Sequence, residues 1–426
     1  MMSALFQLQQ SQWLDPDQLW AQQRRQLREL LLYSCRHVPF YRQGLQVEFA
    51  RLSDEFSLRE YSRLPLLTRA DIQQHFRDLC SDALPRDHGA ASAGTTSGST
   101  GEPIRFLSTL VSTFFWHAFT LREHLWHKRD FRADMVAIRV EKESSVEKNW
   151  FGEVGAGIFR TGRCVVIPAH WTFDRQLARI LEEKPAYLLG YANNLLGVLQ
   201  LADQRRVELP WLREVRSFGE AVSPELRAYV RDRWKVPFSD VYSARETGYI
   251  ALQCPDHEAY HIQSESAIVE VVDDGGNHCA PGEIGCVVVT PLHNFGMPLI
   301  RYDIGDYAEV GGPCACGRGL PVLTRIQGRS RNLLALPDGS RRWPTLAPGK
   351  LLGIAPIRRY KIVQKSIADV EIRLIVDRPL HENELAALRS HFADQLGHAF
   401  NWTFRFLDEF PPTSGDKFED FVSEVA

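Results

Sequence analysis

The sequence predicts an α/β protein with a large N-terminal domain and a small mobile α+β C-terminal domain. Three observations support this class. The chain has 426 residues, which is too long for one ordinary core. Helical patterns dominate the first 80 residues, and short apolar runs then alternate with helical stretches. Near residue 328 the pattern changes again. We therefore expect β-sheets and flanking helices over residues 1–328 and the small domain over 329–426.

Composition narrows the range of partners and surroundings. The net charge is −3, from 50 basic and 53 acidic residues, so nucleic acid and an anionic membrane are not expected as partners. No 18-residue apolar segment and no signal peptide are recognisable, which predicts a cytoplasmic protein. Eight cysteines in a chain of this length do not indicate a disulfide scaffold, so they should be reduced or metal-bound.

The first part of the chain is expected to be helical. Asp15 precedes Pro16, which is typical of a helix start, and Leu27, Leu30 and Leu31 recur at helical spacing. Short apolar runs follow at 135–140 and 164–169. The aromatic segment 111–126 (VSTFFWHAFTLREHLW) either packs in the core, the favoured interpretation, or lines a pocket for an apolar ligand.

Strands and turns dominate from about residue 260 onward. The run 285–292 (GCVVVTPL) follows a turn and predicts a strand, and 360–365, 370–377 and 403–410 predict strands of the small domain. Between these last strands, residues 382–397 form a helical pattern. Its apolar face carries Leu385, Leu388, Phe392 and Leu396. A unit of this size is sufficient for a small α+β domain.

One short run suggests a binding loop. Residues 95–103 read TTSGSTGEP, so five hydroxyl side chains surround glycines with no apolar periodicity. Hydroxyls and open backbone N–H groups suit a polyanion, because glycine lets the backbone approach closely. The alternative is a flexible surface linker.

Five further stretches are weak functional signals when each is taken alone, but their order along the chain is informative. They are SFGEAVSPELR (217–227), VYSARETG (241–248), PLIRYDIGD (298–306), RIQGRSRN (325–332) and PPTSGDKF (411–418). Together with the hydroxyl loop, this order resembles the adenylate-forming superfamily. Within it, the chain is most similar to the phenylacetate–CoA ligase family and its capsule-biosynthesis-type relatives. The runs RHVPFYRQGL (36–45) and FEDFVSEV (418–425) also resemble that branch.

The resemblance implies an ATP-dependent carboxylic acid ligase. The carboxylate would attack the α-phosphate of ATP to give an acyl-AMP and pyrophosphate, and a thiol would then displace AMP to give a thioester. The thiol would come from coenzyme A or from the phosphopantetheine of an acyl carrier protein. The branch and the aromatic segment near Phe114–Trp116 make a small aryl or arylacetic acid the first expectation. Relatives are often homodimers. Two alternatives stay open: transfer of the acyl or adenylyl group to an amine or hydroxyl, and a nucleotide-binding scaffold without catalysis.

The resemblance also implies roles for individual residues. Ser97, Gly98, Ser99, Thr100 and Gly101, with Thr96 beside them, would hold the β- and γ-phosphates. Gly219, Glu220 and Ala221 would border the adenine, with Tyr242 stacked on it and Ser243 adjacent. Glu246 would bind Mg²⁺, and Asp306 would accept both ribose hydroxyls. Arg329 would contact the nucleotide near the hinge, and Lys417 would bridge the α-phosphate and the carboxylate.

Two cysteine-containing stretches predict a possible structural zinc site. CPDHEAYH (254–261) and CACGR (314–318) together offer the four thiolate or imidazole ligands that zinc needs. The expected set is Cys254, His261, Cys314 and Cys316, with His257 as the alternative imidazole. Two unrelated thiol clusters are the other interpretation. Relatives in the branch are similar at these positions, and such a site would tie the loop after Glu246 to the loop after Asp306.

Overall fold

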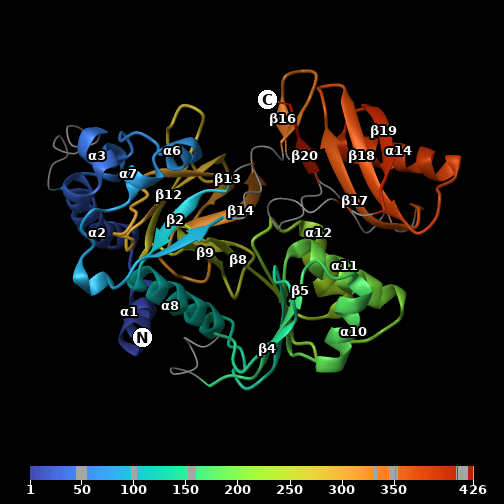
Figure 1. Ribbon diagram of the computed structural model, residues 1–426, viewed down its shortest axis with the longest axis horizontal. Coiled ribbons are helices and arrows are strands. Elements are labelled where there is room, and N and C mark those ends of the chain that lie inside the picture. The colour runs from blue at the N-terminus through green and yellow to red at the C-terminus, as the bar shows by residue number, and fades with distance from the viewer. Residues whose placement is uncertain are drawn as a thin grey trace.

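The structure is a computed structural model. It describes residues 1–44, 55–96, 103–151, 160–329, 333–342, 344, 351, 354–408, 410 and 421–425. A mixed sheet of twelve strands and a separate sheet of four strands lie at different ends of the molecule (Figure 1). The predicted α/β class is therefore confirmed.

The N-terminal segment is helical, as predicted. Its elements are α1 (Met2–Ser11), α2 (Pro16–His37), α3 (Pro39–Gly44), α5 (Leu58–Tyr61), α6 (Arg69–Gln74), α7 (Phe76–Leu79) and the short helix η1 (Arg86–His88). Asp15 caps α2 by accepting from the backbone N–H of Gln18, which confirms the predicted start. Leu27 and Leu31 of α2 are buried in the core beneath the antiparallel part of the large sheet.

The parallel part of the large sheet is built from β3 (Met135–Arg139), β5 (Cys164–Pro168), β6 (Tyr187–Gly190), β7 (Glu214–Phe218) and β8 (Phe238–Ala244), with β4 (Ser145–Glu147) at its edge. The helices of this region are α10 (Phe173–Glu183), α11 (Ala192–Gln204), α12 (Pro224–Tyr229) and η2 (Val230–Trp234). Their apolar sides share one core with Val136, Val165 and Val215 of the strands. The runs at 135–140 and 164–169 are thus buried strands.

The sheet continues as antiparallel strands. These are β9 (Gly248–Gln253), β10 (Tyr260–Ile262), β11 (Ala267–Val272), β12 (Ile284–Pro291), β13 (Tyr302–Gly311) and β14 (Val322–Arg329). A separate hairpin of β1 (Ser92–Thr95) and β2 (Arg105–Ser108) carries the two ends of the hydroxyl loop. The predicted strand 285–292 is β12, which begins one residue earlier.

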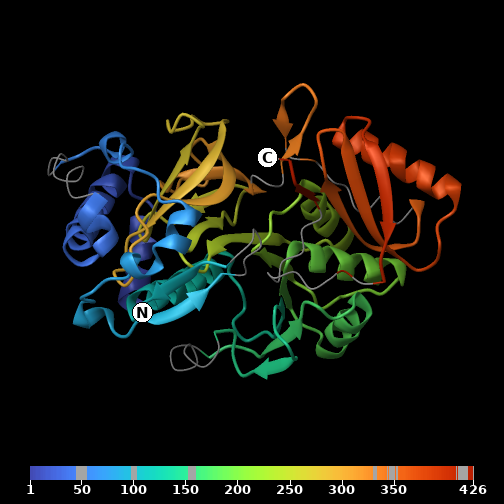
Figure 2. The same cartoon turned by 45° about the horizontal axis from the view of Figure 1, so that its top comes forward.

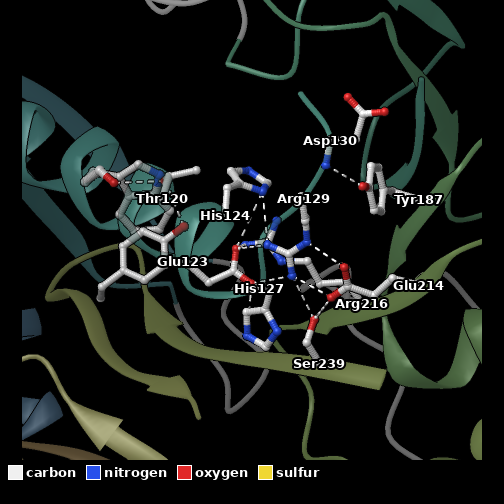
Figure 3. A network of polar contacts seen from close by, with 12 residues as sticks. Thr120, Glu123, His124, His127, Arg129, Asp130, Tyr187, Glu214, Arg216 and Ser239 are labelled. Atoms are coloured by element: carbon white, nitrogen blue, oxygen red, sulfur yellow. Dashed lines mark hydrogen bonds and ion pairs between the residues drawn. The ribbon is translucent and has the colours of Figure 1, made fainter. Parts of the chain in front are cut away.

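A buried network of charges joins helix α8 (Leu110–Trp126) to the parallel strands (Figure 3). The Arg129 guanidinium donates to both Glu123 and Glu214, with N···O distances from 2.5 to 2.7 Å. Arg216 pairs with Glu123 at 2.8 Å. Burial opposes the charge of Glu123, but Arg129 and Arg216 outweigh it and hold the pKa of Glu123 far below its usual range. The network fixes one face of the sheet next to the aromatic residues of α8.

The C-terminal sheet has its own core. It consists of β17 (Ile357–Gln364), β18 (Asp369–Val376), β19 (Asn401–Phe406) and β20 (Phe421–Ser423), with α14 (Glu382–Leu396) beside it and a small hairpin of β15 (Leu334–Ala335) and β16 (Arg341–Arg342) before it. Leu388, Phe392 and Leu396 are buried as predicted, whereas Leu385 is only partly buried. Both views place this sheet beside α11 and α12 (Figure 2). The last strand, β20, was not predicted, and 401–406 replaces the predicted strand 403–410.

None of the helices in the described ranges has the length and apolarity that crossing a membrane requires.

Candidate active site

Tyr242 and Asp306 come from different strands and meet. Tyr242 lies on β8, and its hydroxyl donates to the Asp306 carboxylate on β13 at 3.0 Å. Tyr242 is 8% exposed. Burial and the Asp306 charge raise the pKa of Tyr242 well above its ordinary value, so the phenol stays a neutral donor. The contact fixes the orientation of the ring and of one carboxylate oxygen.

Arg329 completes this cluster. It is the last residue of β14 and lies directly opposite Asp306 in the pairing of β13 with β14. Its Nε is 3.5 Å from Asp306 Oδ1. The Arg329 and Asp306 side chains are 23% and 16% exposed, so the pair keeps access to solvent. Tyr242 and Asp306 are 64 residues apart in the chain, and Asp306 and Arg329 are 23 residues apart, yet the three side chains meet.

The turn Gly219–Glu220–Ala221 follows β7 and borders this cluster. Gly219 has φ +74°, a left-handed conformation that favours glycine. A Cβ placed on Gly328, which precedes Arg329, would lie 3.6 Å from Ala221 Cβ, so the turn packs against the end of β14. Glu220 Oε2 accepts from the backbone N–H of Asn193 in the first turn of α11 at 3.1 Å. This bond holds the turn in place.

The loop after β8 connects this region to the hydroxyl loop. Arg245 donates to the carbonyl oxygen of Thr95 at 2.9 Å, and Glu246 beside it is 7% exposed. Thr96 is anchored to Ile104 by two hydrogen bonds of 3.0 and 3.2 Å. Ser97, Gly98, Ser99, Thr100, Gly101 and Lys417 lie outside the described residues. Ser243 lies on β8 opposite Tyr249.

An aromatic cavity opens beside the same loop. Its volume is about 160 Å³, and its walls include Phe115, Trp116, Phe119, Tyr249 and His293. The rings of Phe115 and His293 are stacked, with centroids 3.8 Å apart and planes 4° apart. Burial lowers the pKa of His293 to about 4, so its ring is neutral near pH 7. Residues of the segment 111–126 therefore line a cavity and also pack in a buried core, as Phe119 does, while ligand binding there stays a prediction.

Sequence reasoning missed most of this cavity. His293, Pro291 and Ser266 come from segments that carried no functional signal, and only the fold brings them to α8. Arg245 and Thr247 lie inside the stretch VYSARETG, in which the sequence predicts roles for Tyr242 and Glu246 only. A charged residue next to a proposed metal ligand was the signal available for Arg245.

Cys254, His261, Cys314 and Cys316 form one cluster. Their ligand atoms all lie within 4.8 Å of one another, and the Sγ atoms of Cys314 and Cys254 are 3.9 Å apart. Zinc–sulfur bonds of about 2.3 Å in a tetrahedron separate two sulfurs by about 3.8 Å. Burial lowers the pKa of His261 to about 4, which keeps the imidazole in the neutral form that binds metals. His257 is exposed and lies outside the cluster.

The loop that carries two of these cysteines also holds the N-terminus. Arg318 Nε donates to Gln12 Oε1 at 3.0 Å, and the Gly319 N–H donates to the Gln12 carbonyl at 2.9 Å. The Arg318 guanidinium lies 4.5 Å from the ring centre of Trp126 and 5.2 Å from that of Trp13. A Cβ on Gly319 would be 1.7 Å from the Leu14 carbonyl oxygen, so only glycine fits this approach.

The fold matches known proteins over nearly the whole chain. It superposes with a TM-score of 0.74 on 2-hydroxyisobutyryl-CoA ligase in its postadenylation state, at 16% identity, covering 97% of this chain and 91% of that one. The same ligase in its thioesterification state gives 0.63. Anthranilate CoA ligase in complex with anthranoyl-AMP gives 0.51 at 19% identity, over 76% of this chain and 65% of that one. The fold is that of the adenylate-forming CoA ligases.

At the level of sequence, the chain is similar to phenylacetate–coenzyme A ligase of Thermus thermophilus. The two are 25% identical over 392 residues, which cover 86% of this chain and 83% of the relative. No protein-family model matches the chain. The resemblance inferred from the motifs is confirmed: the chain is similar in sequence to a phenylacetate–CoA ligase, and its fold is that of the adenylate-forming CoA ligases.

Proposed function

We propose that the cluster of Tyr242, Asp306 and Arg329 binds the adenosine part of ATP. The observation that carries this proposal is the 3.0 Å contact between Tyr242 and Asp306 with Arg329 paired across the strands. Each Asp306 oxygen can accept more than one hydrogen bond, so the carboxylate could accept from the ribose hydroxyls beside Tyr242 and Arg329, and Gly219, Glu220 and Ala221 would border the base. The reaction class follows from the homologue: the chain is an AMP-forming acid–thiol ligase that makes an acyl-AMP and then a thioester.

We propose that Glu246 binds Mg²⁺ together with the phosphates of ATP. The Tyr302 hydroxyl supports a polar ligand here, because it is buried without a hydrogen-bond partner among the described residues. Burial, followed by the charge of Glu246, raises the pKa of Tyr302, so the phenol stays protonated and can donate to such a ligand. Mg²⁺ is commonly held by one or two carboxylates and substrate phosphates, and it would neutralise phosphate charge. Thr96 and residues 97–101 would hold the β- and γ-phosphates.

We propose that the aromatic cavity receives the ring of an aryl or arylacetic acid. A cavity of 160 Å³ is close to the engineered cavity of about 150 Å³ that binds benzene. Its walls come from Phe115, Trp116 and Tyr249, whose rings favour an aromatic guest. The Glu246 loop at one side would place the carboxylate end near the phosphates.

Two parts of the chain are proposed to move relative to each other during the cycle. The units would be residues 1–328 and 329–426, with the hinge at Arg329 and Lys417 delivered to the α-phosphate and carboxylate during the first step. Rotation about the hinge would then clear Lys417 and admit the thiol. This chain superposes on the postadenylation state of 2-hydroxyisobutyryl-CoA ligase with a TM-score of 0.74 and on its thioesterification state with 0.63. The two states of that ligase therefore differ in structure, which supports a movement of this kind.

The acceptor is proposed to be coenzyme A, as in the named homologue. A carrier-protein phosphopantetheine is the second acceptor, and a homodimer is the proposed assembly. A cytoplasmic location is proposed because ATP and coenzyme A are supplied there.

The release of pyrophosphate tests the function. The full chain is given ATP, Mg²⁺ and a panel of benzoates, arylacetates and fatty acids, and coenzyme A is added in a second stage. We expect carboxylate-dependent pyrophosphate release, highest with single-ring acids, followed by a thioester. ATP binding without any carboxylate-dependent pyrophosphate would favour the scaffold alternative, and release with transfer only to amines would favour the other ligase class.

We also propose that Cys254, His261, Cys314 and Cys316 hold one structural zinc ion. The donor set of three thiolates and one imidazole fits a closed tetrahedral site, which leaves no position for a reacting water. Elemental analysis of protein prepared without chelator should give about one zinc per chain. Cys314→Ser should lose that zinc, whereas Cys80→Ser, outside the cluster, should keep it. Zinc-free wild type would contradict the proposal.

A further inference from the structure

The charges around the aromatic cavity are unevenly distributed. Among the described residues that line it, Arg245 is the only one with a permanent positive charge, and Glu246 is the only carboxylate. His293 also lines the cavity, but its ring is neutral near pH 7 and its Nε2 contacts the backbone carbonyl of Glu265 at 2.9 Å. Among the described lining residues, Arg245 is therefore the one that can attract an anionic substrate, in addition to the Lys417 proposed above.

Arg245 is placed at the mouth of the cavity. It is exposed, and one terminal nitrogen donates to the Thr95 carbonyl at 2.9 Å, at the end of β1. No ion pair joins Arg245 to a carboxylate within the ranges that the structure describes. A guanidinium has five N–H donors, so the contact with Thr95 orients the group and leaves an edge for another acceptor.

The chemistry of the substrate requires such a group. The acid must enter as an ionised carboxylate, because its oxygen attacks the α-phosphate, and a carboxylate is costly to place against aromatic walls and beside Glu246. A planar guanidinium matches a carboxylate in two parallel hydrogen bonds. The hydroxyl-loop run TTSGSTGEP itself contains no lysine or arginine and one glutamate.

We propose that Arg245 binds the carboxylate of the aryl acid at the mouth of the cavity, with the ring directed inward toward Trp116 and Tyr249. This inference rests on the proposed ligase function. It assigns a catalytic and specificity role to Arg245, because the residue selects acids over neutral ring compounds. The carboxylate oxygen then attacks the α-phosphate, a new P–O bond forms, and pyrophosphate leaves with the electrons of the bond that breaks.

The test compares Arg245→Gln and Arg245→Lys with wild type, with Arg231→Gln as a matched control. Arg231 is an exposed arginine paired with Asp232, remote from the cavity lining. With the best acid of the panel, Arg245→Gln should raise the KM for the acid by about 10- to 100-fold, the range of a hydrogen bond to a charged group, and leave the KM for ATP within about twofold. Arg245→Lys should have a KM for the acid between those of wild type and Arg245→Gln, and Arg231→Gln should have the KM of wild type.

Two further measurements isolate the carboxylate. The primary amide of the same acid, used as a competitive inhibitor, should bind wild type and Arg245→Gln equally, because it carries no charge. A synthetic aryl-adenylate should give thioester at the same rate with both proteins, since its carboxylate has already reacted. Thermal unfolding of the variants should match wild type, because Arg245 is exposed.

Several results would overturn the inference. An unchanged KM for the acid in Arg245→Gln, a rise confined to the KM for ATP, or equal weakening of the acid and its amide each excludes carboxylate binding by Arg245. These outcomes differ from failure of the proposed function, in which wild type itself would release no pyrophosphate with any acid.

Discussion

Two clusters of arginine and carboxylate in this molecule look alike in composition and differ in burial and geometry. In the buried cluster around Arg129, the Arg129 and Glu123 side chains are at most 1% exposed, and both carboxylates are matched by close guanidinium contacts. In the cluster of Tyr242, Asp306 and Arg329, the Asp306 and Arg329 side chains are partly exposed and their contact is longer, at 3.5 Å. Buried charged groups that are fully paired inside the protein hold its elements together, whereas partly exposed charged groups can also contact a ligand.

The largest expected effect comes from breaking the buried cluster. Arg129→Met leaves Glu123 and Glu214 buried without their shared partner and should lower the free energy of unfolding by about 3–5 kcal/mol. Urea unfolding measures this loss, and the KM for ATP of the folded fraction should not change. Arg163→Met removes an exposed arginine and should cost less than about 1 kcal/mol. Equal losses of unfolding free energy in Arg129→Met and Arg163→Met would mean that burial does not set the cost of breaking an ion pair here.

Asp306→Ala tests the open cluster. It removes the acceptor proposed for the ribose hydroxyls and should lower kcat/KM for ATP by about 100-fold, the effect of one or two hydrogen bonds to a charged group. The free energy of unfolding should fall by about 1–3 kcal/mol, because the buried Tyr242 hydroxyl loses its acceptor, and this is less than in Arg129→Met. ATP titration of pyrophosphate release and thermal unfolding are the two measurements. A large loss of stability with normal use of ATP would reverse the assignment of the two clusters.

Trp116→Ala should have a smaller effect, which is confined to the acid. The variant enlarges the aromatic cavity, so the KM for a single-ring acid should rise about tenfold, and the KM for ATP should stay constant. Trp211→Ala, on the far α-helical side of the sheet, serves as the control. Activity with a larger two-ring acid should improve relative to wild type, and no change in acid preference would place the ring elsewhere.

The smallest expected effect is a pH dependence from His124. Burial, followed by the Arg129 and Arg216 charges, lowers the pKa of His124 well below its usual value, so the folded protein keeps this ring neutral. Below about pH 6.5 the unfolded chain takes up a proton that the folded chain does not, so stability is present above that pH and falls as the pH falls. His124→Asn keeps an acceptor for Arg129 and should flatten the slope between pH 6 and 5 by up to about 1.4 kcal/mol per pH unit. Unfolding curves at several pH values measure it, and parallel slopes would contradict the prediction.

Local signals in the sequence predicted local features well. Asp15 with Pro16 predicted the start of α2, and the apolar spacing of Leu388, Phe392 and Leu396 predicted the buried face of α14. The order of motifs singled out the segments that carry Tyr242, Asp306 and Arg329, and the fold brings these three side chains together, while their roles stay a prediction.

Long-range pairings could not be predicted from the residues. The network of Glu123, Arg129 and Glu214 joins positions up to 91 residues apart, and none of the three has a sequence signature that distinguishes it from a surface charge. The cavity could not be predicted for the same reason, because the fold brings the His293 ring onto Phe115, which is 178 residues away in the chain. Such contacts depend on topology rather than on propensity.

The close approach of Gly319 to Leu14 has a practical consequence for anyone producing this protein. Gln12, Trp13 and Leu14 contact Arg318 and Gly319 in the loop that carries Cys314 and Cys316, so the N-terminal residues support the cysteine cluster. Removing these residues would take away the contacts of Gln12 and Trp13 with Arg318 and loosen the loop that presents Cys314 and Cys316. An affinity tag at this end of the chain therefore belongs on an extended spacer.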